Sequence, residues 1–582
     1  MKEISGSQMI VEALRQEGVK VVFGYPGGAA LNIYDEIYKQ KYFRHILVRH
    51  EQAAAMAADG YARASGKVGV AFVTSGPGFT NALTGLATAY SDSIPIVLIS
   101  GQVATSLIGT DAFQEIDAIG ISRPCVKHNY LVKTIEELPR ILKEAFYIAR
   151  SGRPGPVHVD VPKDVTAKLG VFEYPSEIKM QTYKPNYKGN AKQIKKAVEL
   201  IASCKKPILY IGGGVISAGA SELVRELSEF TQIPVVETLM ALGAMRSDDK
   251  NRLGMVGMHG SYAANMALSE SDLIICLGAR FDDRVTGKLS EFGKNAKIIH
   301  VDIDPAEISK IRTADVPIVG DLADVVPALS AACRAQFAAE PRADTDQWLT
   351  EVAHMRATYP TTWTDTDDGL LQPQEVITHL DAHAPEDTIW VTGVGQHQMW
   401  AAHYLHFTRP RSWMTSAGAG TMGYGVPAAM GAKVGAPDRP VWLIDGDGCF
   451  QMTNQELATA TLNEIPIKIA IINNSSLGMV RQWQTLFYGQ RYSNTDLHTG
   501  AGTARIPDFV KLAEACGAVG IRCERLEDVD DVIAQANAIN DRPVVIDFIC
   551  SADAQVWPMV AAGVSNDDIQ HARGMSPVWE EE

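Results

Sequence analysis

The stretch LIDGDGCFQMTNQELATATLNEIPIKIAIINN, residues 443–474, contains two short apolar segments that each end in small polar residues. The first segment ends in GDG at 446–448 and the second in NN at 473–474, and a segment with helical spacing lies between them. This order is typical of a β-α-β unit, in which consecutive strands are parallel. Because the carboxyl ends of parallel strands meet at one edge of a sheet, we expect Asp447 and Asn474 to lie side by side there.

The same pattern of an apolar segment, a glycine turn and a helical segment recurs along the chain. Apolar segments of this kind start near positions 21, 68 and 94, then near 206, 233, 271 and 297, and again near 387, 439, 466 and 542. Nearly continuous Val, Ile and Leu segments are typical of strands covered by helices on both faces. We therefore predict an α/β fold of three doubly wound parallel-sheet domains. The predicted boundaries are 1–175 for an N-terminal domain, 190–340 for a central domain, 370–555 for a C-terminal domain and 556–582 for a tail.

The length, net charge, apolar segments and cysteines of the chain exclude several classes of protein. A chain of 582 residues is too long for one domain. The net charge of −15, without a clustered basic face, argues against a nucleic-acid partner. No apolar segment reaches the roughly 18 residues that span a membrane, and the N-terminus has no apolar signal segment, so we expect a cytoplasmic protein. The eight cysteines form no CxxC pair and indicate reduced thiols.

The residue types at the two segment ends favour a metal and phosphate site. A carboxylate from Asp447, an amide oxygen from Asn474 and nearby backbone carbonyls are ligands that Mg²⁺ prefers. Glycines allow backbone N–H groups to approach phosphates, and the adjoining helix N-terminus adds a favourable dipole. Asp-Gly turns and Asn-Asn pairs are also common in ordinary loops, and either one alone is more often structural. Together they predict a diphosphate ligand with Mg²⁺.

GDG followed after 24 residues by NN resembles the thiamin diphosphate binding motif. The resemblance implies Asp447 and Asn474 as Mg²⁺ ligands, with the backbone carbonyl of Ser476 as a third. It also implies Glu51, in RHEQAAAM, as the acid that hydrogen-bonds the aminopyrimidine ring of the cofactor; a helix-start carboxylate stabilised by the helix dipole is the alternative. Met452 would support the bent cofactor, or be an ordinary core methionine.

The same resemblance extends to the rest of the cofactor site. It implies that Glu51 and Asp447 meet across a subunit interface, so that the active unit is a homodimer or a dimer of dimers. The remaining positions implied to contact thiamin diphosphate are Gly395, Gln396, His397, Gly420, Met422, Gly446, Gly448, Cys449 and Met479.

Segments along almost the whole chain are similar to one branch of these enzymes. GYPGGA at 24, GTDAFQE at 109, GARFDDRVTGKL at 278, LGMVRQWQTLFY at 477 and SNDDIQHARGM at 565 closely resemble the catalytic subunit of the acetohydroxyacid synthase (acetolactate synthase) family. The implied reaction decarboxylates pyruvate and joins the remaining two-carbon unit to pyruvate or 2-ketobutyrate. The products are 2-acetolactate and 2-aceto-2-hydroxybutyrate, which lead to valine, leucine and isoleucine. A small regulatory subunit is an implied partner.

The family motifs also imply substrate contacts. Arg284 would pair with the carboxylate of the second keto acid, and Trp483 would contact its alkyl group. Without the resemblance, Arg284 is equally well explained as an ion-pair partner of Asp282 or Asp283, and Trp483 as core or interface filler. Phe113 is the third substrate-binding residue that the resemblance implies. The further catalytic residues that it implies are Gly28, whose N–H would face the developing oxyanion, Gln114 and Lys163.

The resemblance implies that the central domain binds FAD without a net redox role. By itself the IGGG segment at 211 is too short for a dinucleotide fingerprint, and a spacer domain without a nucleotide is the alternative. The implied flavin positions are Arg153, Gly212, Gly213, His259, Gly278, Arg280, Asp302 and Asp321.

Three rival functions are distinguishable. A glyoxylate carboligase would lack a carboxylate at position 51. A pyruvate oxidase would use FAD for redox chemistry, would form acetate, and would lack the FDDRVTG and MVRQW segments present here. A noncatalytic homologue would have lost Glu51, Asp447 or Asn474, and all three are present.

Overall fold

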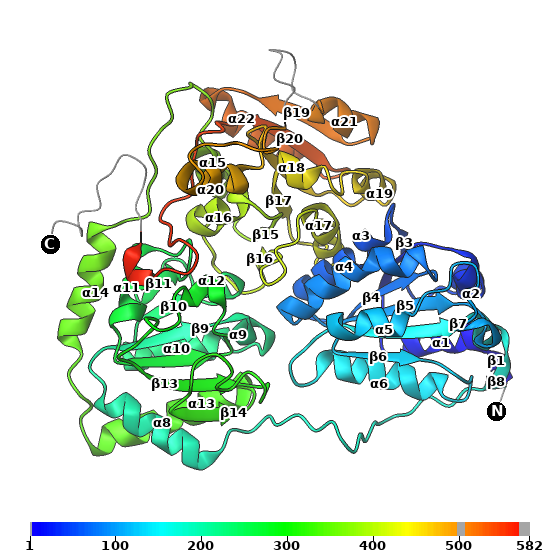
Figure 1. The fold of residues 1–582 in the computed structure, drawn as a ribbon, viewed down its shortest axis with the longest axis horizontal. Helices are drawn as coiled ribbons and strands as arrows, with labels where there is room; N and C mark the ends of the chain where they lie inside the picture. The colour runs from blue at the N-terminus through cyan, green and yellow to red at the C-terminus, as the bar shows by residue number, and fades with distance from the viewer. Residues whose placement is uncertain (1–2, 498–506, 570–582) are drawn as a thin grey trace.

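The computed structural model describes residues 3–497 and 507–569 and contains three six-stranded parallel sheets, each with helices on both faces (Figure 1). The N-terminal part forms the right side of the view, the central part the lower left, and the C-terminal part the top. The predicted α/β architecture of three doubly wound domains is therefore confirmed.

The N-terminal sheet has the strand order β3-β2-β4-β5-β7-β6 and all its neighbours are parallel. A separate antiparallel pair joins β1 to β8. The strands are β1 (Glu3–Ser5), β2 (Val21–Gly24), β3 (Arg44–Leu47), β4 (Gly69–Val73), β5 (Ile96–Gln102), β6 (His128–Leu131), β7 (Val157–Pro162) and β8 (Leu169–Val171). The helices are α1 (Gly6–Gln16), η1 (Gly28–Ala30), α2 (Leu31–Lys39), α3 (Glu51–Ser65), α4 (Pro77–Asp92), η2 (Thr105–Leu107), α5 (Ala118–Ser122), η3 (Arg123–Cys125), α6 (Leu138–Arg150) and α7 (Lys163–Ala167).

The central sheet has the order β11-β10-β9-β12-β13-β14. Numbered from its first strand this is 3-2-1-4-5-6, the order of dinucleotide-binding sheets. The strands are β9 (Pro207–Ile211), β10 (Val235–Glu237), β11 (Arg252–Met255), β12 (Leu273–Leu277), β13 (Lys297–Asp302) and β14 (Val316–Val319). The helices are α8 (Ala191–Ser203), α9 (Gly213–Ser217), α10 (Ser221–Thr231), η4 (Leu239–Ala241), α11 (Tyr262–Glu270), α12 (Asp283–Thr286), α13 (Leu322–Ala339) and α14 (Asp346–Thr358).

The C-terminal sheet has the order β16-β15-β17-β18-β20-β19, which matches the N-terminal sheet strand for strand. The strands are β15 (Ile389–Thr392), β16 (Trp413–Met414), β17 (Val441–Gly446), β18 (Lys468–Asn473), β19 (Val519–Cys523) and β20 (Val544–Ile549). The helices are α15 (Pro373–His383), α16 (Gln396–Tyr404), α17 (Gly425–Gly435), α18 (Asp447–Phe450), α19 (Glu456–Leu462), α20 (Gly478–Phe487), α21 (Phe509–Ala515), η5 (Leu526–Asp528) and α22 (Val529–Ala538). The short helix η6 (Asn566–Asp568) follows this domain in the chain and packs on the central domain, where Asn566 Nδ2 donates to the Val285 carbonyl.

Helices α3 and α17 join the N-terminal and C-terminal domains. A Cβ added at Gly60 would lie 2.1 Å from the carbonyl oxygen of Ala428, and one at Gly431 would lie 1.9 Å from that of Ala57. The two backbones therefore approach too closely for any larger residue, and one apolar core extends through both domains. Because α3 begins at Glu51, this packing fixes the predicted acid relative to the C-terminal domain.

Three connecting segments complete the fold. The passage 172–190 has neither helix nor strand and runs as an extended connection along the bottom of Figure 1, as its composition predicts. Beyond residue 340, the predicted end of the central domain, α14 still packs on the central sheet, and its buried Trp348 indole N–H donates to the carbonyl of Pro207 at 3.0 Å. The predicted tail also lies on the central domain, because the Val560 N–H donates to the Met258 carbonyl at 2.7 Å. Residues 570–582 of that tail lie outside the described residues.

Among the described residues, no helix is long and apolar enough to cross a membrane.

Candidate active site

The two residues predicted from GDG and NN as metal ligands lie at the carboxyl edge of the C-terminal sheet. Strands β17 and β18 are parallel neighbours, with Gly446 opposite Ile472. Asp447 opens α18 directly after β17, and Asn474 follows directly after β18. Both side chains are buried, with 3 % and 6 % of their surface exposed. The structure therefore brings a carboxylate and an amide together at one buried edge, as parallel pairing requires.

The turn after β18 brings Ser476 and Gln396 into contact with the Asn474 side chain. The Ser476 N–H donates to Asn474 Oδ1 at 3.1 Å, and Asn474 Nδ2 donates to Gln396 Oε1 at 3.4 Å. Gln396 follows β15, the other neighbour of β17 in the sheet. Carboxylate, amide and backbone oxygens on adjacent strand ends match the ligand preference of Mg²⁺, so the donor set fits that ion.

A cluster of buried polar side chains, His397, Asp445 and Cys449, lies beside this edge. Burial lowers the pKa of His397 to about 3 and raises the pKa of Asp445 to about 7. Burial also raises the pKa of the Cys449 thiol far above its ordinary range. A Cβ at Gly446 would lie 2.8 Å from His397 Nδ1, so this glycine is needed for close packing. The predicted cofactor residues His397, Gly446 and Cys449 are thus held in a compact, buried cluster next to Asp447.

One cavity of about 760 Å³ contains predicted residues from all three domains. Its volume falls in the range of about 300–1,000 Å³ that is usual for ligand pockets. All eight predicted flavin positions line this cavity, as do two of the three predicted substrate-binding residues and four predicted thiamin diphosphate contacts: Arg153, Gly212, Gly213, His259, Gly278, Arg280, Asp302, Asp321, Arg284, Trp483, Gly395, Gly420, Met422 and Met479. The third predicted substrate-binding residue, Phe113, does not line it. The remaining predicted residues do not line this cavity.

The polar groups of the cavity suit a nucleotide. Arg153 is held by ion pairs to Asp304 at 3.2 Å and Glu307 at 2.8 Å. At the end of β13, burial raises the pKa of Asp302 to about 6. Burial also lowers the pKa of His259 to about 3, and its Nε2 has no hydrogen-bond partner among the described residues. With the strand order of the central sheet, these groups fit a dinucleotide such as FAD.

Arg284 lines the same cavity, and its side chain has no carboxylate partner among the described residues. Asp282 pairs instead with Arg280, at 3.5 Å, and accepts the backbone N–H of Arg284 at 2.9 Å. Within the described part of the chain, no carboxylate lies at ion-pair distance from the Arg284 side chain. The alternative of an Asp282 or Asp283 partner is therefore not what the structure shows. Trp483, on α20, lines the cavity as a partly exposed residue.

The predicted residues of the N-terminal domain follow carboxyl strand ends of that sheet. Gly28 opens η1 after β2, Glu51 opens α3 after β3, and Lys163 opens α7 after β7. Glu51 Oε2 accepts a hydrogen bond from Asn81 Nδ2 at 2.9 Å. The backbone of Gln114, with φ 60°, lies against Gly76 at the start of α4. These groups therefore share one sheet edge without reaching the cavity of their own chain.

Two apolar side chains among the predicted site residues are largely exposed to solvent in the single chain. Phe113 is 88 % exposed and Met452 is 54 % exposed. Both side chains are therefore accessible to a second chain or to a ligand.

Sequence reasoning missed Glu456, which lies inside the opening stretch. Its carboxylate is fully buried and accepts the Arg49 N–H at 2.9 and 3.1 Å and the Thr459 hydroxyl at 2.7 Å. It thereby links α19 to the turn that carries Glu51. A single glutamate in a helical segment gives no signal in the sequence, because its burial depends on the packing between two domains.

Comparison with known proteins identifies the family of the chain. Residues 4–121, 194–329 and 393–548 match the families described as thiamine pyrophosphate enzyme, N-terminal TPP binding domain, central domain and C-terminal TPP binding domain. Thiamine pyrophosphate and thiamin diphosphate are the same compound. The chain is 56 % identical over 581 residues to a Mycobacterium bovis protein named acetolactate synthase, covering 100 % of this chain and 94 % of the relative. The chain belongs to the acetolactate synthase family of thiamine pyrophosphate enzymes.

Two further relatives of the acetolactate synthase family match over nearly their full length. A Corynebacterium glutamicum protein named acetolactate synthase large subunit is 52 % identical, with 100 % of this chain and 92 % of the relative covered. An Escherichia coli protein named acetolactate synthase isozyme 3 large subunit is 46 % identical, with 98 % and 99 % covered. Glu51 lies in the matched N-terminal TPP binding segment, and Asp447 and Asn474 lie in the matched C-terminal one.

Proposed function

We propose that this chain is the catalytic subunit of an acetolactate synthase. It decarboxylates pyruvate and joins the two-carbon unit to a second pyruvate, giving 2-acetolactate and carbon dioxide, or to 2-ketobutyrate, giving 2-aceto-2-hydroxybutyrate. These products belong to the synthesis of valine, leucine and isoleucine. The observation that carries the proposal is one cavity lined by Arg284, Trp483 and four predicted cofactor contacts. The chain that forms this cavity belongs to the acetolactate synthase family.

The cofactor site has separate parts for the two ends of thiamin diphosphate. Asp447, the Asn474 amide oxygen and the Ser476 carbonyl hold Mg²⁺, and the ion and the nearby backbone N–H groups hold the diphosphate. Glu51 holds a proton at the aminopyrimidine ring. When bound, the cofactor supplies the carbanion chemistry that releases carbon dioxide and forms the new carbon–carbon bond.

The substrate groups orient the second keto acid. The Arg284 guanidinium pairs with its carboxylate, because Arg284 lines the cavity and Asp282 is already paired with Arg280. Trp483 contacts the alkyl group, and the Gly28 N–H stabilises negative charge on the reacting oxygen. An apolar contact of this kind separates substrates that differ by one methylene by roughly 1–3 kcal/mol.

We further propose that FAD occupies the central-domain part of the cavity. Arg153, Asp302 and His259 supply charged and neutral polar groups around it, and the sheet has the strand order of dinucleotide-binding domains. Its role is structural, since the reaction involves no net redox step.

The active unit is a homodimer or a dimer of dimers. The exposure of Phe113 and Met452 supports this arrangement, because both have predicted roles in the site and a second chain can cover them. Because related proteins carry the name large subunit, a separate small regulatory subunit is the expected partner. We propose a cytoplasmic location.

The test is an assay of the purified chain with pyruvate, Mg²⁺, thiamin diphosphate and FAD, in which acetolactate is converted by acid to acetoin and measured. Glu51→Gln is expected to lose most of the activity, while Glu12→Gln, which alters an acid on α1, serves as the matched control. Acetate with reduction of the flavin would identify a pyruvate oxidase instead. If no product forms even after a candidate small subunit is added, the proposed function is wrong.

A further inference from the structure

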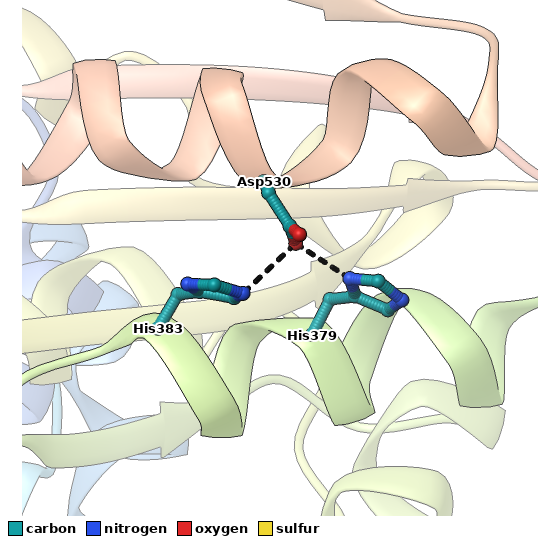
Figure 2. A group of neighbouring side chains, drawn as sticks. All are labelled: His379, His383 and Asp530. Carbon is teal, nitrogen blue, oxygen red and sulfur yellow. Dashed lines mark hydrogen bonds and ion pairs between the residues drawn. The ribbon is translucent and has the colours of Figure 1, made fainter.

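Two helices of the C-terminal domain carry a group of metal-ligating side chains outside the candidate active site. Helix α15 contributes His379 and His383, and the facing helix α22 contributes Asp530 (Figure 2). None of the three lines the 760 Å³ cavity. The proposed reaction assigns them no role.

Both imidazoles converge on one carboxylate oxygen. His379 Nδ1 lies 2.6 Å from Asp530 Oδ1, and His383 Nε2 lies 3.1 Å from the same atom. The three nitrogen and oxygen atoms all lie within 4.8 Å of one another. The side chains are 30 %, 44 % and 48 % exposed, so the group is open to solvent and to a metal ion.

The spacing explains why the two histidines meet. Residues four apart on a helix lie on the same face, one turn above the other, so His379 and His383 both face α22. The imidazole rings are nearly parallel, at 20°, with their centres 6.4 Å apart. Asp530 lies in the first turn of α22, where the helix dipole favours its ionised form.

An ordinary ion pair does not require two histidines at one carboxylate oxygen. His406 and Asp381 form such a pair elsewhere in the same domain, with Nδ1 and Oδ2 2.6 Å apart and one histidine only. At the α15–α22 group, two N–H donors share a single oxygen. A divalent cation at that point replaces both protons and uses the same three ligand atoms.

We propose that His379, His383 and Asp530 form a surface site for one Zn²⁺ ion. Imidazole nitrogen and carboxylate oxygen are usual zinc ligands, and water completes the tetrahedron. Tetrahedral zinc with ligand bonds of about 2.0–2.1 Å separates its ligand atoms by about 3.3 Å, which small side-chain rotations of this group reach. Magnesium is a poorer fit, because it prefers oxygen ligands.

The site joins the start of the C-terminal domain to its last helix. Helix α15 precedes the first strand of the sheet, and α22 precedes β20. A bound ion therefore cross-links segments that are distant along the chain, since His379 and Asp530 are separated by 151 residues. Because the ion binds the folded arrangement only, it stabilises that domain. This inference is independent of the proposed catalytic function.

The experiment measures Zn²⁺ affinity of the metal-free full chain by competition with a chromophoric chelator, in excess Mg²⁺. The variants are His383→Ala and Asp530→Asn, and the matched control is His406→Ala, which removes the single-histidine pair. Loss of even an outer-shell partner typically weakens metal affinity by about 10–100-fold, so each ligand variant is expected to bind at least about tenfold more weakly. Wild type and His406→Ala are expected to bind alike. Unchanged affinity in both ligand variants would show that the group is only an ion pair.

Two further measurements keep the test decisive. Zn²⁺ is expected to raise the unfolding temperature of the wild type and of His406→Ala, but not of the ligand variants, whose exposed positions leave the core intact. Co²⁺ replaces Zn²⁺ as a spectroscopic probe, because a thiolate ligand adds a charge-transfer band that imidazole and carboxylate ligands lack. If this band appears with the first equivalent of Co²⁺, the ion has a thiolate ligand and lies at the buried cluster of His397, Asp445 and Cys449. That result would overturn the proposal.

Discussion

Replacing Glu456 by glutamine tests the buried contact between α19 and the turn before Glu51. The carboxylate is fully buried and accepts the Arg49 N–H and the Thr459 hydroxyl. Glutamine has nearly the same shape and keeps one acceptor oxygen for Arg49, while the Thr459 hydroxyl can turn to accept from the new amide. The substitution therefore removes the ionisable group and leaves the packing in place.

The magnitude follows from the pKa of Glu456. Burial raises it from its ordinary value of 4.5 to about 7, against weaker opposing hydrogen bonds from Thr459 and Arg49. A raised pKa means that the folded chain favours the protonated form. This contribution to stability is complete below pH 4.5 and is lost as the pH rises through 7, by about 3 kcal/mol in all. The glutamine variant has no such loss.

The assay is urea unfolding of the cofactor-free chain at about pH 5 and about pH 8, followed by a probe of the C-terminal domain. At each pH, the free energy of unfolding of the wild type is subtracted from that of the variant. We expect this difference to be larger at pH 8 than at pH 5, by up to about 3 kcal/mol. The control is Glu464→Gln, which alters the glutamate that follows the C-terminal end of α19. An equal difference between variant and wild type at the two pH values would refute the account of Glu456.

Further predictions concern the cavity and the metal edge. Asp447→Asn is expected to raise the Mg²⁺ concentration needed for half-maximal activity by at least about tenfold, measured by Mg²⁺ titration, because it removes a charged ligand; an unchanged requirement would place the ion elsewhere. Trp483→Leu is expected to lower the preference for 2-ketobutyrate over pyruvate by roughly tenfold, measured from product ratios in mixed-substrate assays; an unchanged ratio would remove Trp483 from the alkyl pocket. Gly278→Ala is expected to lose bound flavin, read from the absorbance of the purified chain, because φ is +59° and the added Cβ would lie 2.8 Å from the Gly214 Cα. Gly219→Ala, at φ +66° with no atom within 4 Å, is the control that must retain the flavin.

Much of the fold is predictable because central strands have strong local patterns. The segments that form β17 and β18 are continuous apolar runs, and the residues that follow them correctly predict Asp447 and Asn474 at one edge of a sheet. Sequence patterns do not identify edge strands such as β3, β6 and β16, because these strands are short or only partly apolar. Helix α14 also escapes prediction, because only two of its residues, Trp348 and Val352, are buried and its composition is otherwise mixed.

The candidate site is only partly predictable from residue chemistry. The oxygen ligands of the metal edge follow from residue type and strand order, whereas Arg284 and the flavin positions follow only from a family resemblance. The group formed by Asp59, Arg63, Asp92 and Tyr424 gives no signal in the sequence, although it joins two domains: Arg63 pairs with Asp59 at 2.6 Å and with Asp92 at 2.9 Å. Tyr424 donates to Asp59 from 365 residues away, so only the packing of α3 on α17 shows the link.

The central claim is that this chain joins two 2-keto acids. The most direct measurement is NMR of the products formed from ¹³C-labelled pyruvate and unlabelled 2-ketobutyrate by the purified chain with Mg²⁺, thiamin diphosphate and FAD. The account predicts labelled 2-aceto-2-hydroxybutyrate together with 2-acetolactate, and loss of both products in Glu51→Gln. Labelled acetate or acetaldehyde as the main product, without either coupled acid, would contradict it.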